Sequence, residues 1–188
     1  MNLPLDILLA GFGGQGILLA GRVLAGAALR AGRNVLVNNY YEGFVRGGIS
    51  ECTIVIASGE IGSPVRSRPM VVAALDARAV ANWGAKTDPR GMLLVNVSLI
   101  GDVLRPADRT VHAIPATELA TSVGNPMGAS LAMVGALASL TGAVALTDCT
   151  DALEEAMPAH RRAHLEKNLA ALRRGAAFAS TEILHGAL

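Results

Sequence analysis

The stretch "LLAGFGGQGILLAG", residues 8–21, runs from an apolar segment through a cluster of glycines into a second apolar segment. The segment before the glycines, Asp6 to Ala10, is predicted to be a buried β-strand because it is short, apolar and followed by a turn signal. The segment after them, Gly16 to Ala31, has the length and pattern of a helix, and Gly32 marks its end. The chain is therefore expected to begin with a strand, a tight turn and a helix.

Three glycines of this turn, Gly11, Gly13 and Gly16, fit the pattern Gly-x-Gly-x-x-Gly in the place where dinucleotide-binding folds carry it. Gly11 is expected to permit the sharp turn, Gly13 to let a ligand approach the backbone, and Gly16 to let the helix pack on the strand. The N-terminus of the helix also favours an anion, because its first amides have no partners within the helix.

Three interpretations of the turn remain open: a plain corner, an anion or phosphate site, and an NAD(P) site. The NAD(P) interpretation requires an acid at the end of the second strand to hold the ribose hydroxyl groups. That strand ends at Asn38 and Asn39, and the nearest acid, Glu42, lies in the loop that follows. The anion interpretation needs only backbone amides and Gln15, whose side-chain amide can donate to a phosphate or to a partner carbonyl.

A second glycine-rich stretch, "YYEGFVRGGIS" at residues 40–50, is predicted to be a loop from Tyr40 to Gly48. The guanidinium of Arg46 suits carboxylates and phosphates, and the two glycines after it leave the backbone free to bend. The alternative is a glycine loop with a solvated arginine. The candidate ligand-binding residues are therefore Gly11, Phe12, Gly13, Gly14, Gln15, Gly16, Arg46, Gly47 and Gly48.

Apolar runs of strand length recur along the chain and alternate with helical segments. The further predicted strands span residues 34–38, 51–57, 71–75, 92–97 and 111–114. This alternation predicts a single three-layer, Rossmann-like α/β domain with a mainly parallel sheet over residues 1–188. Thr117 is expected to cap the helix after the last strand. Asp76 and Asn96 fall at the carboxyl ends of strands, where such sheets place ligands, and they fit helix caps equally well.

The second half of the chain is predicted to contain two long helices. Asn125 and Pro126 signal the start of an apolar helix from Met127 to Leu140. The uncharged stretch 127–146 is long enough to cross a bilayer, but its residues are mostly small, so a buried helix is expected instead. An amphipathic helix from about Ala159 to Phe178 ends the chain. Small residues lie near one face of the apolar helix and allow another backbone to approach closely: Gly128, Ala132, Gly135 and Gly142.

The composition excludes several classes of partner. Charged residues make up 16% of the chain, aromatic residues 3%, and the net charge is +1. Nucleic acid is not an expected partner, because there is no basic stripe and there are few aromatic rings to stack on bases. A surface this poor in charge is expected to be covered in part by other subunits, or by a second copy when the chain is isolated.

The sequence shows no complete catalytic apparatus. Cys52 and Cys149 lie far apart, which excludes a self-contained iron–sulfur or zinc site made of cysteines and fits a reducing compartment. His160 and His164 are interpreted as part of a solvated helix face with Glu166, and no metal site is expected there. No serine lies in a Gly-x-Ser-x-Gly turn. No signal peptide is identified, so a cytoplasmic location is expected.

Several motifs follow one another in a characteristic order: "GFGGQG" at 11–16, "RGG" at 46–48, "EIGSP" at 60–64, "LLVNVSLI" at 93–100 and "IPATELA" at 114–120. After a Gly-Asn pair and the small-residue helix comes a tail with Asn168, Ala171 and Gly175. Over about residues 5–178 this series resembles the gamma subunit of 2-oxoacid:ferredoxin (acceptor) oxidoreductases. These enzymes act on pyruvate, branched 2-oxoacids or 2-oxoglutarate.

The resemblance implies a multi-subunit enzyme that decarboxylates a 2-oxoacid on thiamine diphosphate with Mg. The enzyme passes two electrons through [4Fe-4S] clusters to ferredoxin and releases an acyl-CoA. In this family the thiamine cofactor lies between the alpha and beta subunits, and the clusters lie in beta and delta subunits or domains. The isolated gamma chain is therefore expected to bind no cofactor and to be inactive. By resemblance, its glycine turn and Arg-Gly-Gly loop face the cleft shared with the catalytic pair and contribute to coenzyme A binding.

The chain departs from the family pattern at a few positions. Gly43 and Phe44 occupy the positions of Pro and Glu ahead of the Arg-Gly-Gly loop, and Ser130 stands where the small-residue helix often carries Asn. These differences leave the 2-oxoacid undetermined, so the indolepyruvate or aryl-2-oxoacid branch stays open. A self-sufficient NAD(P)-dependent reductase and a pure scaffold are the alternatives from other classes.

Overall fold

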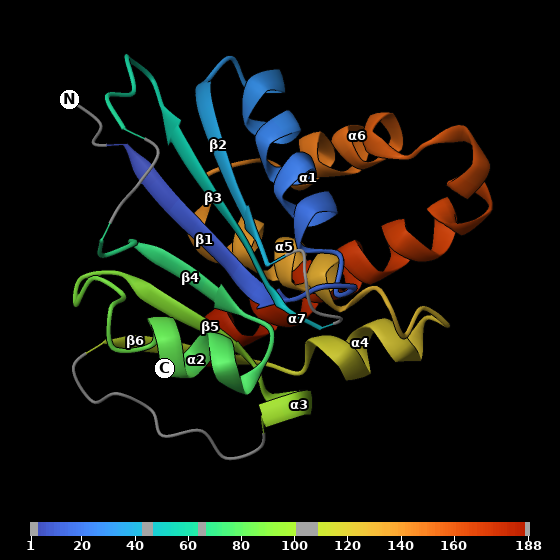
Figure 1. The fold of residues 1–188 in the computed structure, drawn as a ribbon. Coiled ribbons are helices and arrows are strands. Elements are labelled where there is room, and N and C mark those ends of the chain that lie inside the picture. Colours follow the sequence, from blue (N-terminus) through green and yellow to red (C-terminus); the bar gives the residue numbers. More distant parts are fainter. Residues whose placement is uncertain (1–3, 43–46, 64–66, 101–108, 187–188) are drawn as a thin grey trace.

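A computed structural model describes residues 4–42, 47–63, 67–100 and 109–186 of the chain. Their centre is a six-stranded sheet with the strand order β2-β3-β1-β4-β5-β6 (Figure 1). The strands are β1 (Leu5–Phe12), β2 (Asn34–Tyr41), β3 (Ile49–Ala57), β4 (Val71–Ala74), β5 (Met92–Asn96) and β6 (Thr110–Ile114).

The strands of the sheet are parallel except for β3. Strands β1, β4, β5 and β6 run parallel to one another. Strand β3 runs antiparallel to β1 on one side and to β2 on the other. Strand β2 therefore points the same way as β1 but is separated from it by β3. The predicted α/β class with a mainly parallel sheet is confirmed, and β3 is the one described strand that runs against the others.

Helices cover both faces of the sheet and complete the three layers (Figure 1). Helices α5 and α7 lie behind the sheet in that view and α2 lies in front of it. The helices are α1 (Ile17–Arg30), α2 (Ala77–Trp83), α3 (Val97–Ile100), α4 (Ala116–Ser122), α5 (Ala129–Thr141), α6 (Leu146–Ala156), the 3₁₀ helix η1 (Ala159–His164) and α7 (Leu165–Gly186).

Alternation along β1 builds two apolar layers from one strand. Ile7 and Leu9 are buried in the core that packs against α1 and α5. Leu8 and Ala10, which point the other way, are buried in the smaller cluster beneath α2. Each large aliphatic side chain buried in this way stabilises the fold by roughly 1.5–3 kcal/mol.

The stripe of small residues on α5 lets α7 cross it at very close range. A Cβ atom added at Gly135 would overlap the carbonyl oxygen of Leu172 on α7. A Cβ atom added at Gly175 would overlap the carbonyl oxygen of Ala132 on α5. The expected close approach of another backbone is therefore confirmed. Helix α5 is a buried core helix, and within the described residues no helix is both long and apolar enough to span a membrane.

Several predicted boundaries are wrong. Tyr40 and Tyr41, assigned to a loop, continue β2 because they pair with Glu51 and Ser50 of β3. The predicted helix 127–140 begins only at Ala129, because the preceding residues form a tight turn. The predicted tail helix is divided into η1 and the longer α7, and α6 was not predicted.

Thr117 does not cap a helix, which corrects the prediction for the segment after β6. It is the second residue of α4, and Pro115 occupies the cap position without a side-chain hydrogen bond. The amide of Thr117 instead donates to the side-chain oxygen of Asn96 at 3.3 Å, and the side-chain amide of Asn96 donates to the Thr117 hydroxyl at 3.0 Å. A buried residue at the end of β5 thus caps the start of α4 from a distance in sequence.

Candidate functional site at the glycine turn

The turn between β1 and α1 requires glycine at two positions. Gly14 and Gly16 have φ values of +100° and +80°, a left-handed backbone that side chains disfavour. Gly11, expected to permit the turn, still lies in β1, where a Cβ atom would overlap the side-chain oxygen of Gln15. Gly13, expected to admit a ligand, has the ring of Tyr41 against it, 3.0 Å from where a Cβ atom would stand. The role predicted for Gly11 is therefore wrong, because that residue precedes the turn, whereas the approach of a ligand to Gly13 stays a prediction.

Gly16 and Gln15 also differ from expectation. Gly16 packs against Ser130 of α5, since a Cβ atom at Gly16 would lie 2.7 Å from that hydroxyl oxygen. The prediction for Gly16 was packing of α1 on the strand. The Oε1 atom of Gln15 accepts a hydrogen bond from the amide of Phe12 at 2.9 Å. Gln15 thus holds the turn in shape with its side-chain oxygen, and donation from its side-chain nitrogen to a phosphate stays a prediction.

The two glycine-rich stretches meet in space. The amide of Gly13 donates to the carbonyl oxygen of Gly48 at 2.8 Å, which joins the turn to the residues that precede β3. Gly47 adopts φ +73°, and Arg78 donates to its carbonyl oxygen at 3.0 Å. Arg46, the first residue of the predicted Arg-Gly-Gly site, lies outside the described residues.

The N-terminus of α1 is open to a ligand. Gly16 occupies the cap position, so no side chain caps the helix and its first turn contains no acidic residue. The first amides of a helix have no partners within it and carry a partial positive charge. This arrangement agrees with the anion interpretation of the turn.

Basic side chains that sequence reasoning did not assign to a site gather beside this helix end. A cavity of about 530 Å³ is lined by Gly14, Gly16, Leu19, Gly124, Asn125, Pro126, Met127, Met157, Arg161, His164, Lys167 and Asn168. A second cavity of about 340 Å³ shares Gly14, Gly16 and Arg161 with the first and is also lined by Arg22 and Tyr41. We call these two joined cavities the basic groove.

The basic side chains of the basic groove have no acidic partner among the described residues. Arg22, Arg161, His164 and Lys167 are exposed, and within the described residues their side chains form no ion pair. The arginine Arg30, by contrast, is bound to Asp151 and Glu155 of α6. The signal in the sequence was the spacing of residues 161, 164 and 167, which places three basic side chains near one face of a helical segment.

The other side of the turn is apolar. A cavity of about 320 Å³ is lined by Phe12, Gly13, Gly14, Gln15, Leu99, Thr117, Pro126, Met127 and Ala129. It lies at the carboxyl ends of β1 and β5, the edge where open α/β sheets bind ligands. Leu99 and Met127 at its rim are 52% and 69% exposed. We call it the apolar cavity; it adjoins the basic groove, with which it shares Gly14, Pro126 and Met127.

The polar residues at the strand ends are structural. Asp76, left open as a ligand or a cap, accepts a hydrogen bond from the amide of Ala79 at 2.8 Å and caps α2. Asn96 is fully buried and, besides its bonds to Thr117, donates to the carbonyl oxygen of Leu75. Both side chains are used inside the protein, so the apolar cavity has few polar groups of its own.

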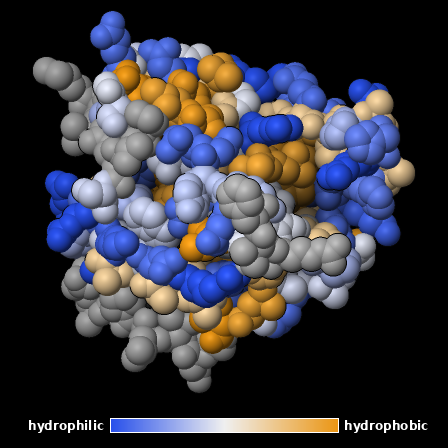
Figure 2. All heavy atoms as spheres, in the orientation of Figure 1, coloured by the Kyte–Doolittle hydropathy of each residue, from blue (hydrophilic) through white to orange (hydrophobic). Residues whose placement is uncertain are grey.

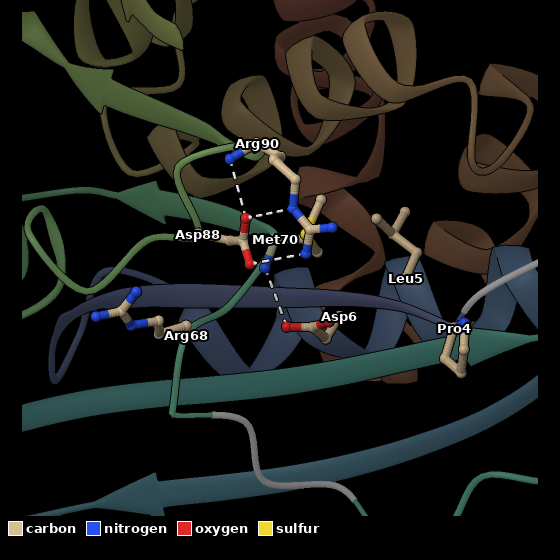
Figure 3. Close-up of a pocket in the computed structure, with 7 residues that line it drawn as sticks. All are labelled: Pro4, Leu5, Asp6, Arg68, Met70, Asp88 and Arg90. Carbon is tan, nitrogen blue, oxygen red and sulfur yellow. Dashed lines mark hydrogen bonds and ion pairs between the residues drawn. The ribbon is translucent and has the colours of Figure 1, made fainter. Parts of the chain in front are cut away.

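A further cavity of about 380 Å³ lies at the opposite end of the sheet (Figure 3). Three of its charged groups bind one another or the backbone: Asp6 accepts from the amide of Met70 at 3.0 Å, and Arg90 donates to Asp88 at 3.1 Å. The hydrogen bonds from Arg90 hold the pKa of Asp88 below its ordinary value. This cavity is at the amino ends of the parallel strands, so we do not consider it the ligand site.

The described residues contain neither a reactive cysteine nor a metal-binding cluster. Burial raises the pKa of the Cys52 thiol to about 11 and that of the Cys149 thiol to about 12, so both stay protonated at neutral pH. Among the described residues no group of three His, Cys, Asp or Glu side chains is placed to hold a metal ion.

Comparison with known proteins identifies the family. A family model described as pyruvate ferredoxin/flavodoxin oxidoreductase matches residues 6–178. The chain belongs to this family. A relative, the 2-oxoglutarate synthase subunit KorC of Methanocaldococcus jannaschii, is 32% identical over 173 residues, which cover 90% of this chain and 91% of the relative.

Solved structures of the oxidoreductase family share the fold. The gamma subunit of a keto/oxoacid ferredoxin oxidoreductase from Geobacter sulfurreducens matches with a TM-score of 0.83 and 27% identity, over 96% of this chain and 98% of that one. A 2-oxoglutarate:ferredoxin oxidoreductase from Magnetococcus marinus, with 2-oxoglutarate, coenzyme A and succinyl-CoA bound, matches with a TM-score of 0.86 and 21% identity. That match covers 96% of this chain and 32% of the other. The predicted family and the predicted role as an oxidoreductase subunit are confirmed.

Proposed function

We propose that this gamma-type subunit supplies one wall of the coenzyme A site of a 2-oxoacid:ferredoxin oxidoreductase. The wall consists of the glycine turn, the basic groove and the apolar cavity. The alpha, beta and delta subunits supply the thiamine diphosphate and Mg site, the [4Fe-4S] clusters and the path to ferredoxin. The chain itself positions the acyl acceptor and carries out no electron or proton transfer.

The observation that carries this proposal is that a basic groove and an apolar cavity adjoin beside the same glycine turn. Coenzyme A has a diphosphate and a 3′-phosphate at one end and a flexible, weakly polar pantetheine arm at the other. Arg161, His164 and Lys167 with the open N-terminus of α1 suit the phosphates, since cations and free helix amides both bind anions. The apolar cavity suits the arm, because its rim is made of exposed Leu99 and Met127.

Exposed apolar side chains around the same edge support contact with the catalytic subunits. Leu18 is 38% exposed and Tyr41 is 53% exposed, and both lie beside the glycine turn. Exposed large apolar residues grouped at one edge are typical of a protein interface. We infer that this edge packs against the thiamine-binding pair, so that coenzyme A would lie at the junction of the subunits. The identity of the 2-oxoacid would then be set mainly by residues of those partners.

The experiment uses the assembled enzyme with variants of this chain. Arg161→Ala and Lys167→Ala should each raise the KM for coenzyme A about tenfold, because each removes a charged contact to phosphate. The kcat at saturating coenzyme A and the KM for the 2-oxoacid should change little. Arg162→Ala is the matched control, since Arg162 neighbours Arg161 but lines neither cavity of the basic groove.

Ionic strength gives an independent readout. The KM for coenzyme A of the wild-type enzyme should rise with salt, and this rise should be smaller in the Arg161→Ala enzyme. If both variants and the control give the wild-type KM and the same salt response, the chain is a scaffold and its glycine turn binds no phosphate.

A further inference from the structure

We propose that Thr117 and Gln15 bind neutral carbonyl oxygens of the acyl acceptor, the amide carbonyls of the pantetheine arm, by donating hydrogen bonds into the apolar cavity. This assignment rests on the proposed function, because it takes coenzyme A as the ligand. It adds which side chains bind the arm and which of them donate. Both residues line the apolar cavity, and their contacts inside the protein leave each of them with an unused hydrogen-bond donor.

A backbone amide fixes the orientation of the Gln15 side chain. The amide of Phe12 can only donate, so the atom of Gln15 that lies 2.9 Å from it is the oxygen Oε1. The nitrogen Nε2 and its two hydrogen atoms therefore lie on the other side of the group, and no described residue accepts a hydrogen bond from them. Gln15 lines the apolar cavity and neither cavity of the basic groove, so its donor belongs to the apolar side of the turn.

The buried side chain of Asn96 fixes the orientation of the Thr117 hydroxyl. The amide of Thr117 donates to Asn96 at 3.3 Å, so the receiving atom is the oxygen Oδ1. The nitrogen Nδ2 of Asn96 donates to the carbonyl oxygen of Leu75 at 3.3 Å and to the Thr117 hydroxyl oxygen at 3.0 Å. The hydroxyl is thus an acceptor toward Asn96, and its own hydrogen atom points elsewhere. No described residue accepts that hydrogen.

The surroundings of these two donors suit a neutral acceptor. None of the described residues that line the cavity is charged, and besides Gln15 and Thr117 they are glycines and apolar residues: Phe12, Gly13, Gly14, Leu99, Pro126, Met127 and Ala129. A phosphate is bound best by cations, which lie in the adjoining basic groove. The pantetheine arm carries two amide carbonyls between apolar methylene groups. It therefore matches an apolar wall with a few donors, whose hydrogen bonds would otherwise stay unmade beside the bound ligand.

Helix α3 extends the apolar wall at the surface. Figure 2 shows hydrophobic surface over α3 at the lower edge of that view, and Leu99 of this helix is 52% exposed at the rim of the cavity. The methylene groups of the arm can pack against this surface while its carbonyl oxygens accept from Thr117 and Gln15.

The test measures the KM for coenzyme A of the assembled enzyme. Thr117→Val removes the hydroxyl at nearly constant shape and should raise this KM about fivefold. Thr117→Ser keeps a hydroxyl and should stay within about twofold of the wild-type KM. Gln15→Glu keeps the acceptor for Phe12 but replaces the donor by an anionic acceptor. It should raise the KM at least about tenfold, while urea unfolding of the chain changes little.

Ionic strength separates these contacts from those of the basic groove. The Thr117→Val enzyme loses a neutral contact, so its raised KM should keep the wild-type rise with salt, whereas Arg161→Ala should reduce that rise. Thr121→Val is the matched control and should keep the wild-type KM. Thr121 lies on the same helix as Thr117, but it does not line the cavity, and its hydroxyl donates to the carbonyl oxygen of Thr117.

A wild-type KM for coenzyme A in Thr117→Val and Gln15→Glu would overturn the proposal. Equal rises in Thr117→Val and Thr117→Ser, or a rise in the KM for the 2-oxoacid instead, would overturn it as well. If Thr117→Val does not assemble, Gln15→Glu decides by the same measurement. If Arg161→Ala raises the KM for coenzyme A and the Thr117 and Gln15 variants do not, this inference alone fails. If none of them changes it, the proposed function fails too.

Discussion

The side-chain oxygen of Gln15 accepts a hydrogen bond from the main-chain amide of Phe12 at 2.9 Å. The side chain therefore folds back over Gly11 and closes the glycine turn from within. Gln15, whose side-chain amide suggested direct contact with a phosphate, thus stabilises the backbone of the proposed ligand site.

This contact separates two substitutions at Gln15. Gln15→Ala should lower the free energy of unfolding by about 1 kcal/mol, because the amide of Phe12 loses its acceptor. Gln15→Glu keeps an acceptor at the same reach and should cost much less. Urea unfolding of the isolated chain measures both. Equal losses in the two variants would mean that the hydrogen bond to Phe12 contributes nothing.

The chain should not bind NADH. An NAD(P) site needs a ribose-binding acid at the end of the strand next to β1, and here β3 lies between β1 and β2. With strands about 4.8 Å apart, the end of β2 is roughly 10 Å from β1, and the Tyr41 ring lies against Gly13. Titration with NADH, followed by energy transfer from Trp83, should show no saturation up to ~1 mM. Micromolar binding would favour the reductase hypothesis.

The close crossing of α5 and α7 predicts a strong effect of one methyl group. Gly175→Ala should lower the free energy of unfolding by about 1–3 kcal/mol, because its Cβ atom would overlap the carbonyl of Ala132 and force the helices apart. Gly59→Ala is the control, since nothing lies within 4 Å of a Cβ atom there. Denaturant midpoints that shift equally in both variants would contradict this account of the helix contact.

Burial of His112 on β6 predicts a pH dependence of stability. Burial lowers the pKa of His112 below 6.5 in the folded chain, an effect that Glu182 partly opposes. The unfolded chain therefore binds a proton more readily, so this contribution to stability is present above about pH 6.5 and is lost as the pH falls through the folded pKa. Between about pH 7.5 and 5.5 the wild type should lose more stability than His112→Gln. His160→Gln, at an exposed position, should follow the wild type.

The sequence was sufficient to predict the features that depend on local patterns. The alternation of apolar strands and helices predicted the α/β class. The glycine cluster at 11–16 predicted a turn between a strand and a helix, although the left-handed backbone falls at Gly14 and Gly16 and not at Gly11. The small residues of α5 predicted a close backbone contact, which Gly135 makes with α7. In each case the residues that determine the feature are close to one another in the sequence.

Features that depend on distant segments were not predicted. The insertion of β3 between β1 and β2 has no local signature, because it follows from how the chain returns after β2. The basic groove joins Arg22 of α1 to Arg161 of η1, residues that only the packing of α6 and η1 near α1 brings together. The ring of Tyr41 against Gly13 is a contact of the same kind, because Tyr41 comes from the end of β2.

The hydrogen bond between the amide of Gly13 and the carbonyl oxygen of Gly48 can form only after the chain has reached β3. Since Gly48 immediately precedes β3, the joint cannot exist on a nascent chain that has completed only its first strand and helix. An incompletely folded subunit would then lack the surface that we propose packs against the partner subunits. Assembly on that surface would select mature chains and leave unfinished ones unincorporated.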